Sequence, residues 1–309
     1  MNINATIKVG ALFKLVCHKG DPNKPTKQTD WFHNLVLDSG LNRLSVGRAD
    51  LQLNIGTGNS TPVVTQTNLD AYLASTTSVQ TQTSGRNMTN PSVPYWWGQR
   101  TFRFNPGVGT GNIAELGLAW ANNACFNRAL VKDISGNPTV IQKLADEYLD
   151  VLVEVRVYPQ VNISGSFNLR DKTDAIVSTH TYTGKVLLIA DPGGWWALGQ
   201  VAFNTVANGM RISNAAMPTD LTTNVGNEVF FGNITNTTYP TTKSAKGEVV
   251  LALASANNTH LSFSACFAGI VTGNSAVIGY KWQISPAITK LNTWELRHNF
   301  TISWDRYTP

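Results

Sequence analysis

The stretch VLVEVRVY at residues 151–158 decides the fold class, because every second residue in it is a valine. Val151, Val153, Val155 and Val157 share one face at period two, which is typical of a β-strand buried on one side. The pattern predicts that all four valines face the protein core. A charged side chain at one of these positions is then expected to destabilise the protein.

The same alternation appears near both ends of the chain. It covers residues 7–17, and in HNFTISW (298–304) it places Phe300, Ile302 and Trp304 on one face. Shorter strands separated by Gly, Pro, Asn and Asp turns are expected between these ends. They are predicted at 31–37, 100–104, 111–120, 124–131, 185–190, 248–255, 260–267 and 276–282, and residues 51–62 are predicted to be a strand that runs into a glycine-rich turn.

Helix signals are few. GLNRL (40–44) predicts a short helix capped by Asp38 or Ser39, and TNLDAYLAS (67–75) predicts a helical turn. The polar stretch 76–94 is expected to be a long loop. Many short strands with little helix indicate an all-β protein of the sandwich or barrel class.

Two sequence blocks recur in the two halves of the chain. The pattern G-N-x-A-x-φ-G-φ-x-W, in which φ is an apolar residue, begins at Gly111 and again at Gly273. A second pattern with the spacing I-x-K-L-x₄-L begins at Ile141 and again at Ile288. In both halves the second block leads into an alternating strand, which indicates an internal repeat.

The repeat predicts two β-sandwich, jelly-roll-like domains of common ancestry. The N-terminal domain is expected to span residues 1–160 and the C-terminal domain residues 161–309. The boundary is placed after Tyr158-Pro159, because proline ends the strand pattern.

Charge and apolar content limit the partners. Charged residues make up only 14% of the chain, the net charge is +5, and lysine and arginine are spread over both halves. A nucleic-acid partner is not expected, since binding to nucleic acid requires a clustered basic surface. No apolar run approaches the roughly 18 residues of a membrane span, and the N-terminus does not resemble a signal peptide. Membrane insertion is therefore not expected.

Cysteine and histidine spacing gives no sign of a disulfide framework or a metal site. Cys17, Cys125 and Cys266 lie far apart, which predicts reduced, half-buried thiols in a protein made in a cytoplasm. Cys17 and His18 are neighbours on a strand, so they point to opposite faces. None of the five histidines has metal-ligand spacing: His18, His33, His180, His260 and His298.

Two other motifs are of kinds that can bind phosphate or supply catalytic carboxylates. The glycine-rich IGTGN (55–59) lacks both the third glycine of a dinucleotide site and the Lys-Ser/Thr of a P-loop, so a turn is predicted. Asp146 and Glu147 are adjacent residues before a strand and are expected on a solvated turn, with Asp150 close by. A carboxylate pair assembled across the two domains stays open as an alternative. No catalytic residue, metal ligand or cofactor is predicted.

Paired tryptophans are the candidate contact residues. Trp96 and Trp97 follow Tyr95, and Trp195 is followed by Trp196. Adjacent strand residues face opposite ways, so one tryptophan of each pair is expected in the core and the other outside. Three interpretations stay open for these residues: core packing, a protein interface, or a sugar site in which indole faces and amides contact the ring and its hydroxyls.

Several blocks occur in an order that resembles virion structural proteins of tailed bacteriophages. They are TDWFHNLVLDSGLNRL, LNIGTGNSTPVVTQTNL, GNIAELGLAW and FNRALVKDISGNPTVIQKLADEYLDVLVEVRVYP. Proteins with these blocks are often labelled tail fibre, tail or minor structural proteins. The resemblance covers about residues 5–160, residues 260–309 echo it through the repeat, and residues 161–259 depart from it. It implies a component of the tail, fibre, baseplate or neck, and it carries no catalytic motif.

The expected function is therefore a non-enzymatic structural component of a tailed-phage virion. Such a component is made in the bacterial host cytoplasm and assembles with other virion proteins and with copies of itself. A homo-oligomer is expected, and a trimer is favoured for a fibre-like part. The alternative is a receptor- or carbohydrate-binding module of the virion, with a host surface glycan as partner. A polysaccharide-degrading enzyme is the third and weakest hypothesis.

Overall fold

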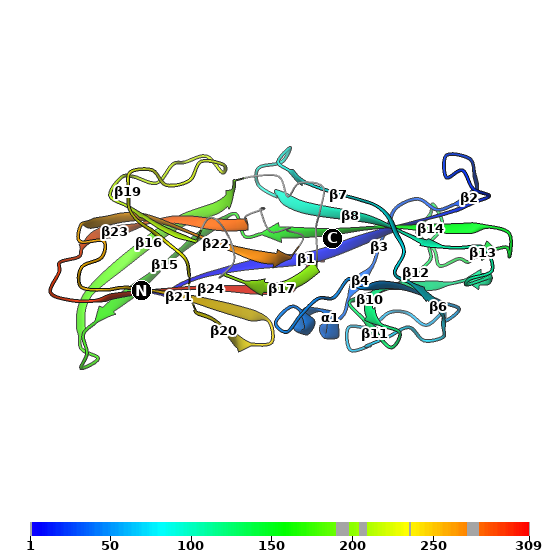
Figure 1. The fold of residues 1–309 in the computed structure, drawn as a ribbon, viewed down its shortest axis with the longest axis horizontal. Coiled ribbons are helices and arrows are strands. Elements are labelled where there is room, and N and C mark those ends of the chain that lie inside the picture. The colour runs from blue at the N-terminus through cyan, green and yellow to red at the C-terminus, as the bar shows by residue number, and fades with distance from the viewer. Residues whose placement is uncertain (1, 190–197, 204–208, 235, 271–277, 309) are drawn as a thin grey trace.

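The fold is built almost entirely from strands. The computed structural model describes residues 2–189, 198–203, 209–234, 236–270 and 278–308. Strands make up 60% of the chain and helix 2%, which confirms the predicted all-β, sandwich-type fold. The short helix α1 (Asp38–Arg43) lies under the long sheet in Figure 1.

The largest sheet runs along the long axis of the molecule and has nine strands (Figure 1). Its order is β20-β21-β24-β1-β14-β8-β7, and β2 and β3 also pair with β1. The strands are β1 (Asn2–His18), β2 (Pro25–Gln28), β3 (Phe32–His33), β7 (Val79–Asn87), β8 (Tyr95–Phe104), β14 (Tyr148–Pro159), β20 (Asn236–Thr241), β21 (Ser244–Leu251) and β24 (Leu296–Arg306).

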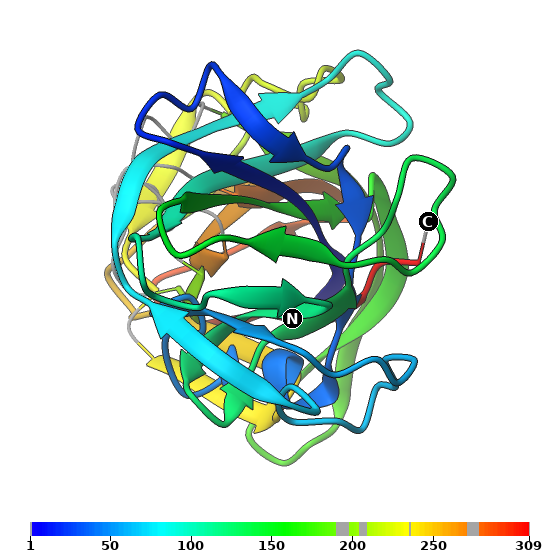
Figure 2. The same ribbon diagram turned by 90° about the vertical axis from the view of Figure 1, so that its right-hand side faces the viewer.

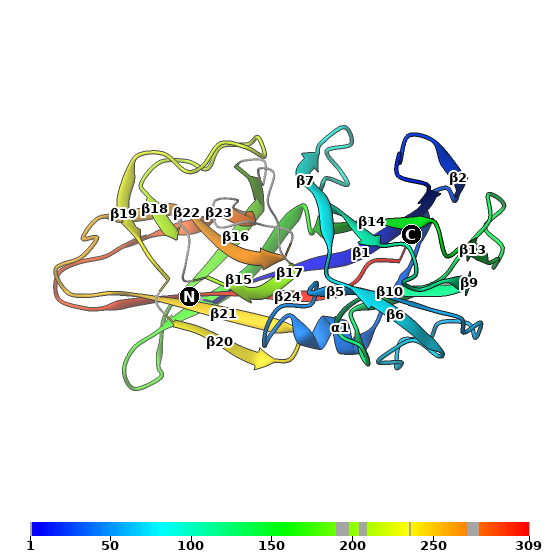
Figure 3. The same ribbon diagram turned by 45° about the vertical axis from the view of Figure 1, so that its right-hand side comes forward.

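Two smaller sheets form the second layer, with a two-stranded ladder of β9 (Gly111–Ile113) and β13 (Ile141–Lys143) beside them. The six-stranded sheet comprises β4 (Leu35–Val36), β12 (Asn127–Leu130), β10 (Glu115–Ala121), β5 (Gln52–Gly56), β6 (Tyr72–Thr76) and β11 (Ala124–Cys125). The seven-stranded sheet comprises β15 (Asn162–Arg170), β16 (Ile176–Leu188), β23 (Ile278–Thr289), β22 (Thr259–Ile270), β18 (Met210–Ser213), β19 (Glu228–Gly232) and β17 (Leu198–Ala202). Figure 3 shows the seven-stranded sheet at the left and the six-stranded sheet at the right.

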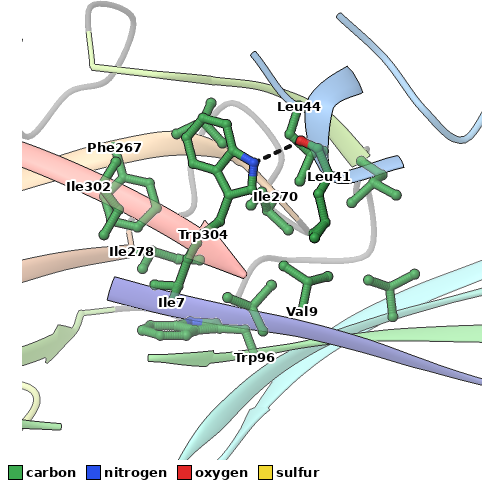
Figure 4. Packing of buried hydrophobic residues seen from close by; sticks show 14 of the residues in the cluster. Ile7, Val9, Leu41, Leu44, Trp96, Phe267, Ile270, Ile278, Ile302 and Trp304 are labelled. Carbon is green, nitrogen blue, oxygen red and sulfur yellow. Dashed lines mark hydrogen bonds between the residues drawn. The ribbon is translucent and has the colours of Figure 1, made fainter. Parts of the chain in front are cut away.

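One contiguous hydrophobic core joins the three sheets. Trp304 of β24 lies where they meet and packs with Leu41 and Leu44 around α1 and with Phe267 and Ile270 of β22 (Figure 4). Its indole N–H donates to the Leu41 carbonyl at 2.8 Å. The buried indole is therefore both packed and hydrogen-bonded, which fixes the position of α1 against the long sheet.

The period-two predictions for the two best strands are confirmed. Val151, Val153, Val155 and Val157 are all fully buried. The predicted inward residues of the last strand are also buried: Phe300, Ile302 and Trp304. Both sets lie on the same inner face of the nine-stranded sheet. Val153 lies opposite Phe13 and Phe300 lies opposite Ile3, and Ile3 and Phe13 share one face of β1.

Strands from both sides of residue 160 share the nine-stranded sheet. β1 pairs antiparallel with β14, where Phe13 lies opposite Val153, and parallel with β24, where Ile3 lies opposite Phe300. The predicted division into residues 1–160 and 161–309 stays a prediction, and neither half contains the whole of this sheet.

The repeated blocks have matching places around β1. Each half supplies three consecutive neighbours in the sheet, β7-β8-β14 on one side and β20-β21-β24 on the other. The lysines of the second block, Lys143 and Lys290, are both fully or almost fully buried and donate to backbone carbonyls, Lys143 to Asn105 at 3.1 Å and Lys290 to Ala252 at 2.8 Å. Gly273 and the start of the second copy of the first block lie outside the described residues.

Three local predictions were wrong. Residues 67–75 contain no helical turn, because residues 72–76 form β6, which pairs with the available edge of β5. The expected loop at 76–94 contains β7, a polar edge strand that pairs with β8. Neither Asp38 nor Ser39 caps α1, because the N-cap position is Leu37, which makes no side-chain cap bond.

Candidate functional site

The first tryptophan pair divides between the two faces of β8. Trp96 is fully buried opposite Val157, so its candidacy as an interface or sugar contact is wrong: strand alternation turns it into the core. Trp97 lies on the outer face and is half-buried. Its ring covers Gly85 of β7, where a Cβ atom would approach the indole Cζ2 to 2.9 Å. Trp195 and Trp196 lie outside the described residues.

Aromatic side chains gather around Trp97 on the outer face of the nine-stranded sheet. The outer aromatic patch consists of Tyr95, Trp97, Arg156, Tyr158 and Tyr307, all half-buried. Trp97 lies opposite Arg156 across the β8–β14 ladder. None of the five belongs to the hydrophobic core.

Ring contacts hold this patch together. Tyr158 and Tyr307 stack with centroids 3.8 Å apart, and Tyr95 approaches Tyr158 at 5.2 Å. The guanidinium carbon of Arg156 lies 4.8 Å from the Tyr95 ring centroid, and its Nε donates to Glu154 at 2.6 Å. Burial raises the pKa of Tyr158, while the Arg156 cation opposes this shift. The patch is therefore a pre-ordered surface of aromatic rings with one guanidinium.

The glycine-rich turn at 55–59 wraps a carboxylate of the protein itself. Glu115 is fully buried, and its Oε1 accepts from the backbone N–H of Gly58 at 3.0 Å and of Ala71 at 2.8 Å. Its Oε2 accepts from Arg128 Nε at 2.7 Å. A Cβ on Gly58 would lie 2.4 Å from Glu115 Oε1, so the close approach requires glycine. This N–H group already binds an internal anion.

The acidic run near residue 147 is held in ion pairs. Asp146 is exposed and pairs with Lys19 at 2.7 Å, as expected of a solvated turn. The same expectation is wrong for Glu147, which is almost fully buried and accepts from Lys27 Nζ at 3.0 Å. Burial alone would raise the pKa of Glu147, but hydrogen bonds from the Leu144 N–H, from Thr26 and from Lys27 lower it to about 2.

Asp150 belongs to a separate cluster on the same strand. Arg103 donates to its two carboxylate oxygens at 2.7 and 2.6 Å, and His18 Nε2 lies 3.2 Å from Oδ2. His18 also stacks on Tyr148, with centroids 5.3 Å apart. The Asp150 carboxylate therefore faces the Arg103 guanidinium and the His18 imidazole. These contacts fix the end of β14 to β8 and β1.

The thiols and the other ionisable groups form no metal-ligating cluster within the described ranges. Cys17, Cys125 and Cys266 are free and fully buried, which is deeper than the half-buried thiols expected. Burial raises the pKa of Cys17 to about 11 and that of the other two to about 12, so all three are held as thiols. No group of three His, Cys, Asp or Glu side chains converges there, and none of the described helices has the length and apolar character of a membrane span.

Described residues also line two surface cavities. One, of about 630 Å³, lies between residues 27–30 and the hairpin at 131–142, at the end of the molecule that faces the viewer in Figure 2. Near it Ile134 is 86% exposed and Val140 53% exposed. The other, of about 560 Å³, is lined mainly by asparagines at the far end of the seven-stranded sheet.

Comparison with known proteins adds no relative. No protein-family model, no curated protein and no solved structure matches this chain.

The outer aromatic patch combines one candidate from the sequence with four residues that sequence reasoning did not select as contacts. Tyr95 and Trp97 are two apart on a strand, as are Arg156 and Tyr158, so period two already places each pair on one face. The sequence alone does not show the register of β8 against β14. It also does not show that the C-terminal segment brings Tyr307 onto Tyr158.

Proposed function

We propose that this chain is a non-enzymatic structural component of a tailed-phage virion that assembles as an oligomer through the outer aromatic patch. The observation that carries the proposal is this cluster of half-buried rings on an open sheet face of a charge-poor protein. Tyrosine, tryptophan and arginine are the residues enriched at the centre of protein interfaces. The sequence resemblance to virion proteins supports the location.

The internal contacts of the patch favour a protein partner over a sugar. Tyr158 and Tyr307 cover each other's ring faces, and Arg156 covers a face of Tyr95. These faces are not free to stack on a pyranose ring, which leaves Trp97 as the available indole. A pre-ordered set of rings loses little side-chain entropy when a protein surface packs on it.

The oligomer we propose is a trimer, or another cyclic arrangement that the particle imposes. A cyclic arrangement requires two different surfaces on each subunit, because the contact is head-to-tail. The outer aromatic patch would supply one of them, and the exposed apolar residues Ile134 and Val140 near the 630 Å³ groove would supply a second.

The test is an electron-microscopy map of the particle together with a variant pair. Trp97→Ala is expected to leave the unfolding midpoint nearly unchanged and to lower incorporation into purified particles at least tenfold. Trp31→Ala removes a tryptophan that is 39% exposed and lies outside the patch, so it serves as the control. Absence of the protein from the particle, or a patch facing solvent there with Trp97→Ala incorporated normally, would sink the proposal.

A receptor- or carbohydrate-binding module remains the second candidate function. One observation favours it: the asparagine-lined cavity, which lies on a different sheet from the outer aromatic patch. An enzyme that degrades polysaccharide would need two convergent carboxylates. Asp146, Glu147 and Asp150 instead face cations.

A further inference from the structure

Sheet topology brings three separate chain segments to one cavity. β18 ends at Ser213, β19 begins at Glu228 and β22 begins at Thr259, and these strands are neighbours in the order β22-β18-β19. Because neighbouring strands are antiparallel, the end of β18 and the beginnings of β19 and β22 lie at the same end of the sheet. Figure 3 shows the three strands side by side at its left.

The cavity at this end has a volume of about 560 Å³ and is lined largely by amides. Its lining residues are Asn214, Asn227, Glu228, Val229, Ala256, Asn257 and Asn258. Each amide offers two N–H donors and a carbonyl acceptor. The side chains of Asn214 and Asn227 are exposed and bond to no described protein group, so they are available to a ligand.

Two buried polar side chains form hydrogen bonds with the loop that makes up one wall of the cavity. Lys290 is 1% exposed, and its Nζ donates to Asn257 Oδ1 at 2.8 Å and to the Ala252 carbonyl at 2.8 Å. His260 is fully buried, and its Nε2 bonds the Ala256 carbonyl at 2.8 Å. The Lys290 amine and the His260 imidazole, which both lie in the core, therefore hold the loop that presents Asn257. This wall of the cavity is ordered before a ligand binds.

Two lining residues have backbone conformations that non-glycine residues rarely adopt. Asn227 has φ of +49° and Ala256 has φ of +53°. Such a conformation is unfavourable for alanine, whereas asparagine adopts it more readily than most residues with a Cβ. Both residues line the cavity beside asparagine side chains.

The charges around the cavity discriminate among ligand classes. Among the described residues, no lysine, arginine or histidine lines it, so the described lining offers no cation to a phosphate or another anion. Its single carboxylate, Glu228, is paired with Arg211, which leaves no acidic cage for a divalent cation. A neutral ligand with many hydroxyls fits a lining that is rich in both donors and acceptors.

An aromatic ring lies close to the same site. Phe231 lies on the edge strand β19 and is 49% exposed. The guanidinium of Arg211, which pairs with the lining residue Glu228, covers one face of the ring at 4.8 Å from its centroid, so only the opposite face is open to a ligand. A ring beside a set of amides is the combination that recognises the apolar face and the hydroxyls of a pyranose.

From these observations we propose that the asparagine-lined cavity binds a neutral saccharide. The amides of Asn214, Asn227 and Asn257 bond its hydroxyls, and Phe231 packs on the ring. This inference does not depend on assembly through the outer aromatic patch, because the two surfaces share no residue.

The experiment measures saturation-transfer NMR on the full chain with four probes: the methyl glycosides of glucose, galactose, mannose and N-acetylglucosamine. At least one probe is expected to receive saturation, with a Kd in the millimolar range typical of single sugars. The double variant Asn214→Ala/Asn227→Gly is expected to weaken that Kd at least tenfold, and glycine at 227 retains the positive φ.

Two further variants separate binding from folding. Asn257→Asp keeps an oxygen acceptor for Lys290, now as a carboxylate that pairs with its ammonium, but removes the amide donor. It is therefore expected to weaken sugar binding without lowering the unfolding midpoint. Asn23→Ala removes an exposed asparagine from the loop before β2 and is expected to bind as the parent does. Three results would overturn the proposal: no transfer to any probe, equal binding by parent and double variant, or calcium-dependent stabilisation that the double variant abolishes.

Discussion

Replacing His298 by phenylalanine removes a proton-binding group from the packing between β22 and β24. His298 is 1% exposed, and neither ring nitrogen has a hydrogen-bond partner in the described part of the chain. Its ring lies 5.1 Å from that of Phe263 and 6.0 Å from that of His260. Burial lowers the pKa of His298 well below its usual value of 6.5, so the native protein holds it neutral.

The sign of the pH effect follows from the direction of this shift. The unfolded chain takes up a proton near pH 6.5, whereas folded His298 does not, so the free energy of unfolding decreases as pH falls below that value. A single histidine that stays neutral in the folded state costs about 2.7 kcal/mol between pH 7.5 and pH 4.5. Burial and the nearby Lys290 also lower the pKa of His260, which adds a loss of the same sign.

Urea unfolding followed by tryptophan fluorescence at pH 7.5, 6.5, 5.5 and 4.5 measures the effect. His298→Phe is expected to lie within about 1 kcal/mol of the parent at pH 7.5, since it exchanges unpaired nitrogens for a ring of similar size. At pH 4.5 the variant should retain up to about 2.7 kcal/mol that the parent has lost, the full amount if folded His298 stays neutral throughout this range. Glu147, whose pKa lies at about 2, titrates below this window.

The control is a substitution in the same cluster that removes no titrating group. Phe263→Leu is expected to lower stability by about 1–2 kcal/mol at every pH, because it alters packing alone. Parallel pH curves for the parent and His298→Phe would refute the assignment of acid sensitivity to this buried imidazole.

Three further changes test the packing of the two layers. Glu115→Ala is expected to cost about 3–5 kcal/mol, because Arg128 stays buried with part of its charge uncompensated; a loss under about 1 kcal/mol in urea unfolding would contradict the role given to Glu115. Val153→Asp, which buries a carboxylate in the core, is expected to cost more than about 3 kcal/mol in the same assay, and an unchanged midpoint would show that Val153 does not face the core. An excised 1–160 fragment leaves the β24 side of β1 unpaired and is expected to aggregate; a soluble monomer with strand-type circular dichroism would instead support two independent domains.

The sequence predicted strands well where one face is buried. β14 and β24 alternate because one side of each contacts the core and the other does not, so their pattern carries the register by itself. β7 was missed because its residues are exposed or half-buried on both faces, and VQTQTSGRN therefore shows no apolar period. A polar edge strand is determined by the neighbour that it pairs with, here β8, and not by its own hydrophobicity.

The wrong helical turn at 67–75 has a related cause. Leu69 and Leu73 have helical spacing, yet Leu69 is 4% exposed and Leu73 36% exposed, so they do not share a face. The burial of Glu147 could not be predicted from the sequence either, because its partners Thr26 and Lys27 come from β2, which is far away in sequence. Contacts of this kind depend on tertiary pairing that no local pattern encodes.

Three of the sequence blocks quoted in the sequence analysis converge on one buried network. Gly58 comes from the block LNIGTGN, Glu115 from GNIAELGLAW and Arg128 from FNRALV. In the structure the Gly58 N–H and Arg128 Nε both bond the carboxylate of Glu115, and Arg128 also pairs with Asp70 at 2.8 Å. A change in one block leaves a buried charge or donor of another block unpaired, which is costly.

These blocks therefore specify how the six-stranded sheet closes, and the last of them also carries Arg156 and Tyr158 of the outer aromatic patch and the exposed apolar residues near the 630 Å³ groove. The other residues to which we assign binding lie outside the blocks. Trp97 precedes GNIAELGLAW, Tyr307 follows the repeated strand near the C-terminus, and the asparagine-lined cavity lies in the part of the chain between residues 161 and 259. Buried networks of this kind specify the fold, while partner choice depends on residues at the surface. Exchanging Trp97 or Asn214 is therefore expected to change binding without changing the fold.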